Sequence, residues 1–522
     1  MNVISDLFAE AESGNTVDKD DYEAELSELR MELLNLQYDL KRRDFSVVLL
    51  IVGDDLPGVV ASLRVLHEWM DGRYIQNHVM FDTPGEKFAE RPLVKRYWQR
   101  LPPSGSIGLF LGAWPYLLLG TAFDEDWSDE ELDRGLDDVT RFEKLLVDDG
   151  TLLLKYWLHL PKKKLKNRVA AAERNPQKYW DYAQYDWKFL KRYGDRFELV
   201  ERLMGRTNKP STPWRIIEST DPRYRNLALA NHIASALQTR LCSDSAQTVA
   251  SNAVSKIAQS DESALNEIDL GASVDEDTYR KKLPKLQARL NRLSHRAHKA
   301  GVHCVFLFEG VDAAGKGGAI RRLAAALPVQ HTRVIPIAAP TETELARHYL
   351  WRFWTRLPDA GKTVIFDRSW YGRVLVERVE ELAQVHEWSR AFDEINEFEA
   401  SLRDSNFVVC KFWLQIDADT QLSRFEARAQ TPYKKYKLTD QDYRNREKWV
   451  QHQAAAEEMI ALTSTSHAPW TLVAANDKRH ARLQVLSTVV ESLDRQLCIL
   501  DVADSTQQRK GKKNRKSKKR DA

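Results

Sequence analysis

A glycine-rich segment in the second half of the chain has the residues of a phosphate-binding loop. Gly310-Val-Asp-Ala-Ala-Gly315-Lys316-Gly317 matches the pattern G-x-x-x-x-G-K, with glycine where serine or threonine is usual. Consecutive backbone N–H groups in such a loop hold phosphate oxygens, and the lysine contacts the phosphate that is transferred. Besides Lys316, the predicted phosphate-binding positions are Gly310, Ala313, Ala314, Gly315, Gly317 and Gly318.

Two acidic residues are candidates for a metal site. Asp312 stands inside the loop, where a carboxylate would repel phosphate unless a cation lay between them. Asp367 ends the apolar run Thr363-Val-Ile-Phe, in the position of a carboxylate that holds Mg²⁺ beside a phosphate-binding loop. We therefore expect Asp312 and Asp367 to hold Mg²⁺, or Mn²⁺ in its place. For Asp312 the alternatives are activation of the acceptor and a cap of the turn.

Basic residues follow these acids. Arg368 and Arg373 come directly after Asp367, where they could neutralise a phosphoryl group in transfer. A basic stretch from Arg424 to Lys448 could close over phosphates as a lid, although a solvated helical face is the other interpretation. Arg424 is a candidate catalytic residue, and the candidate phosphate-binding cations are Arg321, Lys434 and Lys437.

A third group could contact a nucleotide. Glu377 lies one helical turn beyond Arg373, where it could join the metal or pair with the arginine. Asn476 and Asp477 follow the final apolar run, where they could contact a base or cap a helix. The candidate nucleotide-binding residues are Tyr371, Glu377, Asn476 and Asp477.

The elements that must position these residues alternate between strands and helices. Short apolar runs predict strands, and we expect helices over 319–327 and 343–356. Such alternation predicts an α/β fold with a parallel sheet covered by helices on both faces. The predicted strands are Val302–Phe308, Arg333–Ala338, Thr363–Asp367, Phe407–Ile416 and Trp470–Ala475.

The same pattern occurs twice. Trp98-Gln-Arg-Leu-Pro102 recurs as Trp354-Thr-Arg-Leu-Pro358, and similar matches at an offset of 256 keep register over nearly 200 residues. We expect two tandem copies of one domain. The predicted divisions are a helical N-terminal extension (1–44), a degenerate domain (45–242), a linker (243–284), a catalytic domain (285–505) and a basic disordered tail (506–522).

The first copy lacks the chemistry of the second. Five functional positions of the second copy, namely Lys316, Asp367, Arg368, Arg373 and Glu377, align with Val59, Leu111, Gly112, Leu117 and Thr121. Asp55 still stands where the second copy has Asp312. Because valine cannot neutralise a phosphate, we expect the first copy to be catalytically silent, with a role in scaffolding, docking or oligomerisation.

Composition excludes other classes of protein. The chain has 522 residues, 78 basic and 76 acidic, and its longest apolar run, Val47–Val52, is far too short to cross a bilayer. The four cysteines form no CxxC pair, so neither a disulfide framework nor a zinc ribbon is indicated. The N-terminus lacks the pattern of a signal peptide, and we expect a cytoplasmic protein. Nine basic residues between Arg509 and Arg520 could attract polyanions, or remain solvated without a specific partner.

Three motifs carry a resemblance to a known family. Glu309-Gly-Val-Asp-Ala-Ala-Gly-Lys-Gly317, Asp367-Arg-Ser-Trp-Tyr-Gly-Arg373 and Tyr433-Lys-Lys-Tyr-Lys-Leu438 together resemble polyphosphate kinase family 2, in its fused two-domain form. The resemblance implies a thymidylate-kinase-like P-loop fold in each copy and transfer of a phosphoryl group from inorganic polyphosphate to AMP, giving ADP, with Mg²⁺. It also implies that Asp312, Lys316, Asp367, Arg368, Arg373 and Arg424 belong to the active site.

Alternatives to this function remain. Gly372 stands where many single-domain members have asparagine, which leaves ADP, GMP or GDP open as acceptors. An ATP-dependent nucleotide kinase and a non-enzymatic polyanion binder are the rival classes. We expect polyphosphate and AMP or ADP as partners, no membrane, no specific nucleic acid, and a homo-oligomer.

Overall fold

The computed structural model describes residues 3–80, 92, 94–124, 128–175, 193–243, 264–431 and 440–518. Their contacts divide the chain into two compact units. Unit 1 comprises Met1–Phe88, Leu93–Thr248 and Pro340–Thr355, and unit 2 comprises Ala89–Pro92, Val249–Ala339 and Arg356–Ala522. The segment 340–355 of the second repeat therefore belongs to the unit of the first.

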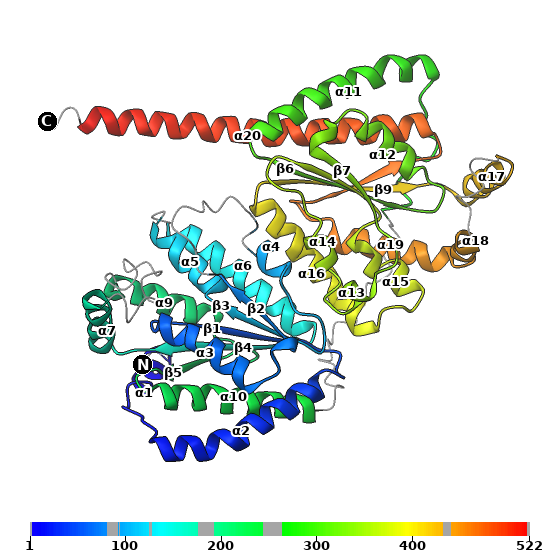
Figure 1. Cartoon of the computed structure of the whole chain (residues 1–522). Helices are drawn as coiled ribbons and strands as arrows, with labels where there is room; N and C mark the ends of the chain where they lie inside the picture. Colours follow the sequence, from blue (N-terminus) through cyan, green and yellow to red (C-terminus); the bar gives the residue numbers. More distant parts are fainter. Residues whose placement is uncertain are drawn as a thin grey trace. The chain divides into compact units, whose positions relative to one another are not determined.

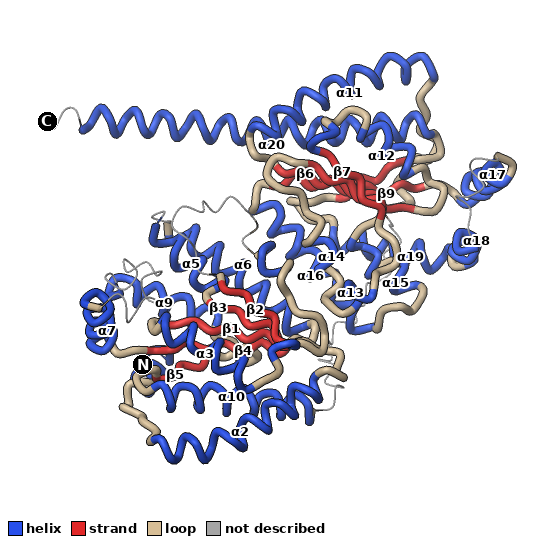
Figure 2. Tube along the Cα trace, in the orientation of Figure 1, coloured by secondary structure: helices blue, strands red, loops and turns tan. Residues whose placement is uncertain are grey.

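Unit 2 contains a five-stranded parallel sheet in the order β10-β9-β6-β8-β7 (Figures 1 and 2). Its strands are β6 (His303–Gly310), β7 (Thr332–Pro336), β8 (Thr363–Asp367), β9 (Phe407–Gln415) and β10 (Trp470–Ala474). Each predicted strand is present within two residues of its expected bounds. Four of the five are short apolar runs that the sheet buries, whereas the edge strand β7 is partly exposed.

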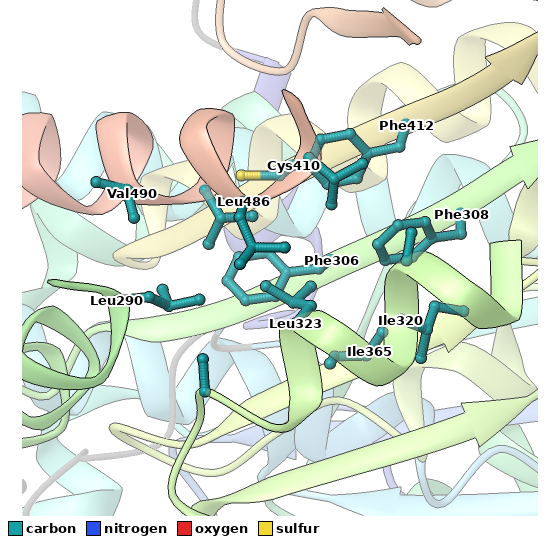
Figure 3. Packing of buried hydrophobic residues seen from close by; sticks show 14 of the residues in the cluster. Leu290, Phe306, Phe308, Ile320, Leu323, Ile365, Cys410, Phe412, Leu486 and Val490 are labelled. Atoms are coloured by element: carbon teal, nitrogen blue, oxygen red, sulfur yellow. The ribbon is translucent and has the colours of Figure 1, made fainter. Parts of the chain in front are cut away.

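Helices cover both faces of this sheet. On one face α11 (Glu276–Lys299), α12 (Lys316–Ala324) and α20 (Lys478–Lys518) pack on the strands, and α16 (Val385–Asp404) and α19 (Trp449–Thr463) lie on the other (Figure 1). Apolar side chains fill the first layer (Figure 3), among them Leu290, Phe306, Phe308, Leu323, Ile365, Phe412 and Leu486. The remaining elements of this unit are η3 (Val329–His331), η4 (Trp370–Arg373), α15 (Val376–Val379), α17 (Ala418–Ala429) and α18 (Asp440–Glu447).

Unit 1 repeats the topology, with strand order β2-β3-β1-β4-β5. The strands are β1 (Val47–Gly53), β2 (Ile75–Val79), β3 (Ile107–Leu111), β4 (Leu152–His159) and β5 (Trp214–Glu218). The helices are α1 (Val3–Glu10), α2 (Lys19–Leu40), α3 (Leu56–Trp69), α4 (Lys95–Trp98), α5 (Ala113–Asp124), α6 (Asp129–Asp148), α7 (Lys162–Arg174), α9 (Tyr193–Thr207) and α10 (Pro222–Cys242), with the short η1 at Gly72–Tyr74. The N-terminal extension is helical as expected, and it packs on the first repeat: Leu29, Leu33, Leu36 and Leu40 of α2 are buried in that core.

One glycine in each repeat allows the turn after the first strand of its sheet to pass close to a neighbouring strand. A Cβ added to Gly310 would lie 2.3 Å from the backbone oxygen of Leu414, and one added to Gly53 would lie 2.1 Å from that of Leu158. Both glycines also have positive φ, 136° and 151°. A side chain at either position would push the end of its strand out of the sheet.

The expected helix over 343–356 is a wrong prediction. The structure has two short helices there, α13 (Glu342–Leu345) and α14 (Trp351–Trp354), both within unit 1. The amide N–H of Leu350 donates to Nδ1 of His348 instead of to a helical carbonyl, so the helix ends before this point. The intervening turn brings Trp354 onto Trp98, with ring centroids 5.7 Å apart and planes 10° from parallel.

The basic tail also differs from the expected disorder. α20 continues as a helix as far as Lys518, and residues 519–522 lie outside the described part of the chain. Lysine, arginine and glutamine, which dominate this segment, have high helix propensities. None of the helices described is long and apolar enough to cross a membrane.

Candidate active site

The loop between β6 and α12 has the backbone conformation that its glycines allow. Gly315, the N-cap of α12, has φ +110°, and Ala313 has φ +64°. α12 begins at Lys316, three residues before the expected start, because Gly315 ends the turn and Lys316 to Ala319 already have helical geometry. The first amide groups of this helix therefore face the position where a phosphate is expected.

Lys316 folds back over the loop. Its Nζ donates to the backbone oxygens of Gly310 at 2.6 Å and Val311 at 3.3 Å. Burial lowers the pKa of the Lys316 ammonium, and the nearby Asp312, Asp367 and Glu309 oppose that shift. The ammonium is thus placed at the mouth of the loop and held by weak neutral acceptors, which an anionic phosphate can replace.

Asp312 is the centre of a polar cluster. Its Oδ1 accepts a hydrogen bond from Nη2 of Arg368 at 3.2 Å, and its Oδ2 accepts one from Nδ2 of Asn445 at 2.7 Å. Burial alone would raise the pKa of Asp312, but Lys316, Arg368 and the Asn445 hydrogen bond outweigh burial and hold that pKa below its ordinary value. The carboxylate is therefore charged at neutral pH.

Arg368 reaches Asp312 from a strained backbone. Its φ is +66°, a left-handed conformation that costs a non-glycine residue about 1–2 kcal/mol. Two bonds hold it there: the Arg368 N–H donates to the backbone oxygen of Phe308, and the neighbouring Ser369 Oγ donates to Oε1 of Glu309 at 2.8 Å. The left-handed conformation of Arg368 turns the chain at the end of β8, so that Asp367 and Arg368 both lie near the phosphate-binding loop.

The two carboxylates suit the predicted Mg²⁺. Magnesium prefers oxygen ligands and keeps several waters or substrate phosphate oxygens, so one or two protein carboxylates suffice. The charged Asp312 and the carboxylate of Asp367, both close enough to Lys316 to affect its pKa, provide that number. No cluster of three or more acidic, histidine or cysteine ligands occurs within the described residues.

The predicted arginines have different surroundings. Arg373 pairs with Glu377 at 3.1 Å and Glu387 at 3.4 Å, so of the two roles left open for Glu377 the structure shows the ion pair. Arg424 donates to four backbone oxygens, those of Ala313 and Ala314 in the loop and of Ala475 and Asn476 after β10. Arg424 thus joins the phosphate-binding loop to the end of β10.

The side chains of Tyr371, Asn476 and Asp477 bond to partners outside the cluster around Asp312. Tyr371 is fully buried, and its hydroxyl donates to Glu399 and accepts from Lys411, away from solvent. Asn476 bonds with Asp417, and Asp477 caps the start of α20 by accepting from the His480 N–H at 2.6 Å. Lys434 and Lys437 lie outside the described residues.

A pocket of about 760 Å³ lies beside the loop. Four positively charged side chains line it, those of Arg424, Lys478, Arg479 and Arg482. Two negatively charged ones, Asp419 and Asp477, line it as well. Arg482 also lies near the start of α12, since a Cβ on Gly318 would be 3.5 Å from its Nη2. Arg321, by contrast, is exposed on α12.

Sequence reasoning missed three residues. Glu309 is a buried acid whose pKa is raised by burial, with Lys316 opposing the rise, and its position in an otherwise apolar strand was the signal that could have revealed it. Asn445 and His452 gave no such signal. His452 lies near Asp312, and burial lowers the pKa of its imidazole although Asp312 opposes that shift.

The corresponding site in the first repeat is filled by its own side chains. Asp55 is fully buried, accepts a hydrogen bond from Ser219 and lies 3.5 Å from Nη1 of Arg225. Asp54 binds Nδ1 of His159 at 2.5 Å, while Glu12 binds its Nε2 at 3.0 Å. Val59 is buried in place of the lysine and carries no charge, and the guanidinium of Arg225 beside this loop is paired with Asp55.

Comparison with known proteins agrees with this geometry. The model of the family "Polyphosphate kinase 2 (PPK2)" matches residues 16–245 and again 273–499. The chain is 43% identical to a polyphosphate:AMP phosphotransferase of Pseudomonas aeruginosa, over 94% of this chain and 99% of that protein. It is 36% identical to a polyphosphate:AMP phosphotransferase of Acinetobacter johnsonii, over 89% of this chain and 96% of that protein.

A solved structure extends the likeness to the whole fold. The crystal structure of a polyphosphate kinase 2 from Pseudomonas aeruginosa PA01 superposes with a TM-score of 0.83 at 41% sequence identity, covering 94% of this chain and 99% of that one. The resemblance seen in the sequence motifs is thus confirmed over both repeats. This chain belongs to the polyphosphate kinase 2 family.

Proposed function

We propose that this enzyme transfers a phosphoryl group from inorganic polyphosphate to AMP, giving ADP, in the second repeat. The observation that carries the proposal is the cluster of Lys316, Asp312 and Arg368 around a phosphate-binding loop. The similar full-length relatives named polyphosphate:AMP phosphotransferase support the same donor and acceptor.

Each charged group of the site has a separate role in the proposed transfer. The amides at the start of α12 and the Lys316 ammonium hold the phosphoryl group that leaves the donor. Arg368, released from Asp312, would stabilise the charge on that group during transfer. Mg²⁺ held by Asp312 and Asp367 would neutralise phosphate oxygens of donor and acceptor. The AMP phosphate is already anionic, so the attack needs positioning rather than a strong base.

The pocket beside the loop suits a long anionic donor. Polyphosphate is a repeating chain of phosphates, which needs a track of positive charge rather than a pocket for a base. The lining by Arg424, Lys478, Arg479 and Arg482 supplies such a track next to α12. A pocket selective for ATP would instead need contacts for the purine ring.

The test compares donors and acceptors on the same enzyme. Purified protein with Mg²⁺ receives either long-chain polyphosphate or ATP as donor, and AMP, ADP or GMP as acceptor. ADP formed from polyphosphate and AMP, with no transfer from ATP, is the expected result. Transfer only from ATP would make this a nucleotide kinase, and transfer only to ADP would replace the acceptor.

Two further expectations accompany this function. A homo-oligomer should elute and scatter light at a multiple of the 60.2 kDa chain mass. A cytoplasmic location should place the protein in the fraction that holds free nucleotides. Both stay predictions.

A further inference from the structure

One side chain of α18 bonds directly to the phosphate-binding loop. Asn445 Nδ2 donates to Oδ2 of Asp312 at 2.7 Å, across 133 residues of sequence. The orientation of the amide follows from its partner, since an ionised carboxylate only accepts hydrogen bonds and the NH₂ group must face it. The carbonyl oxygen of Asn445 is buried and has no hydrogen-bond partner among the described residues.

A second set of contacts supports the first. Arg446, next in α18, donates through Nη1 to the backbone oxygen of Ala418 at 2.7 Å and to Oε1 of Gln421 at 3.0 Å. Gln421 in turn donates through Nε2 to the backbone oxygen of Asp312 at 3.1 Å. Both the carboxylate and the backbone of Asp312 are therefore tied to the same pair of helices, α17 and α18.

The Asp312 carboxylate needs such support. One of its oxygens faces Arg368, and the side chain of that arginine is 42% exposed, so that an incoming phosphate could compete for it. If Arg368 left, Asn445 would be the hydrogen-bond donor that still fixes the direction of the carboxylate. An orientation held in this way leaves lone pairs of both oxygens open to a cation.

We propose that Asn445 is a positioning residue: its amide holds α18 on the phosphate-binding loop and orients the Asp312 carboxylate toward the cation. The proposal rests on the proposed function only for the consequence in catalysis. We call the Asn445–Asp312 hydrogen bond the clamp, and it is present in the protein without substrate. Its loss therefore has a readout that is independent of polyphosphate.

The neighbouring Arg444 provides a matched control. It lies on the same helix, one residue away, but its side chain is exposed and has no hydrogen bond or ion pair with any described residue. Arg444→Ala therefore changes the helix propensity and charge of α18 without touching Asp312. Any effect specific to Asn445→Ala must come from the clamp.

The first experiment is hydrogen–deuterium exchange on the full-length protein without metal or substrate. A hydrogen bond to a charged group changes a local equilibrium by about tenfold or more. We expect amides of Asp440–Glu447 to exchange about tenfold faster in Asn445→Ala and at the wild-type rate in Arg444→Ala. Exchange of β6 should stay unchanged in both, which shows that the fold is intact.

A second variant tests whether Asn445 orients the Asp312 carboxylate toward the cation. Asn445→Asp places two carboxylates within hydrogen-bonding distance, so without metal α18 should leave the loop and its amides should exchange faster. Mg²⁺ alone should restore protection in Asn445→Asp, because a cation lying between the two carboxylates removes their repulsion. Mg²⁺ should not restore it in Asn445→Ala.

The results of these experiments distinguish a failure of the positioning role of Asn445 from a failure of the proposed function. If α18 exchanges equally fast in wild type, Asn445→Ala and Arg444→Ala, the clamp is disproved, whatever the activity. If Mg²⁺ fails to protect Asn445→Asp, Asn445 does not face the cation and the proposal fails in that part. If the clamp is present but wild-type enzyme transfers nothing from polyphosphate, the proposed function fails and the clamp stands.

Discussion

The ammonium of Lys411 lies 2.8 Å from the carboxylate of Glu399, and neither side chain has any exposed surface. The first repeat has the same pair at the same offset, with Lys155 2.7 Å from Glu143. Both lysines also donate to a backbone oxygen, that of Thr463 or Thr207. The difference is Tyr371, whose hydroxyl joins the pair in the second repeat and which the first replaces with Pro115.

Lys411→Met should destabilise unit 2 by about 3–5 kcal/mol, because it leaves Glu399 buried without its partner. Burial already raises the pKa of Glu399, and Lys411 opposes that rise. The variant should also lower phosphoryl transfer, since Tyr371 in η4 loses a donor and Arg373 ends the same turn. Urea denaturation and initial rates measure the two effects.

Lys155→Met is the matched control for that variant. It breaks the equivalent pair in unit 1 and should cost a similar free energy of unfolding. At temperatures where the protein stays folded it should leave the rate of transfer unchanged. Equal losses of activity in Lys155→Met and Lys411→Met would contradict a catalytic site confined to the second repeat.

Arg368 combines charge and backbone strain, and two substitutions separate them. Arg368→Ala removes the guanidinium, and should cost on the order of 10²–10³ in rate as other charge-stabilising groups do. Arg368→Gly should lose as much activity but raise the melting temperature relative to Arg368→Ala, because glycine adopts φ +66° without strain. Differential scanning calorimetry gives the comparison. A less stable glycine variant would show that the turn is not strained.

His159 predicts a pH dependence of unit 1. Burial would lower the pKa of its imidazole, but Asp54 and Glu12 outweigh burial and raise that pKa above the ordinary 6.5. The stabilisation by charged His159 is therefore complete below about pH 6.5 and is lost as pH rises through the higher, folded-state pKa. The difference in unfolding free energy between wild type and His159→Gln should shrink from pH 6 to pH 9. A difference that grows with pH has the wrong sign for this account.

The cysteines should fall into two pairs by reactivity. Burial raises the pKa of Cys304 to about 12 and that of Cys410 to about 11, whereas Cys242 and Cys498 are exposed. Because the thiolate is the reactive form, a thiol reagent should modify two cysteines quickly in the native protein and four after denaturation. Mass spectrometry identifies which two react. Fast modification of Cys304 would mean that its core opens readily.

The sequence was sufficient where the structural signal is local. β8 occupies Thr363–Asp367 as predicted, because an apolar run ends there in one carboxylate. The loop around Lys316 was predictable from spacing alone. The Tyr371 side chain was not, since its position depends on Lys411 from β9 and Glu399 from α16, which come together only in the folded chain.

Contacts that leave no pattern in the sequence account for the other differences. Nothing near Asn445 in sequence indicates that it bonds to Asp312. Between α13 and α14 the Leu350 N–H donates to the His348 ring, a contact that the residue types alone do not indicate. Arg424 was predicted as a catalytic candidate, and only the structure shows that its donors bind backbone oxygens of the loop and of the segment after β10.

The most direct test of the central claim is phosphoryl transfer from polyphosphate to AMP by a matched pair of variants. Lys316→Ala should lower the rate by on the order of 10²–10³, because the ammonium that holds the transferring phosphate is lost. Val59→Ala, at the equivalent position of the first repeat, should leave the rate unchanged. Full activity of Lys316→Ala, or an equal loss in Val59→Ala, would contradict catalysis in the second repeat.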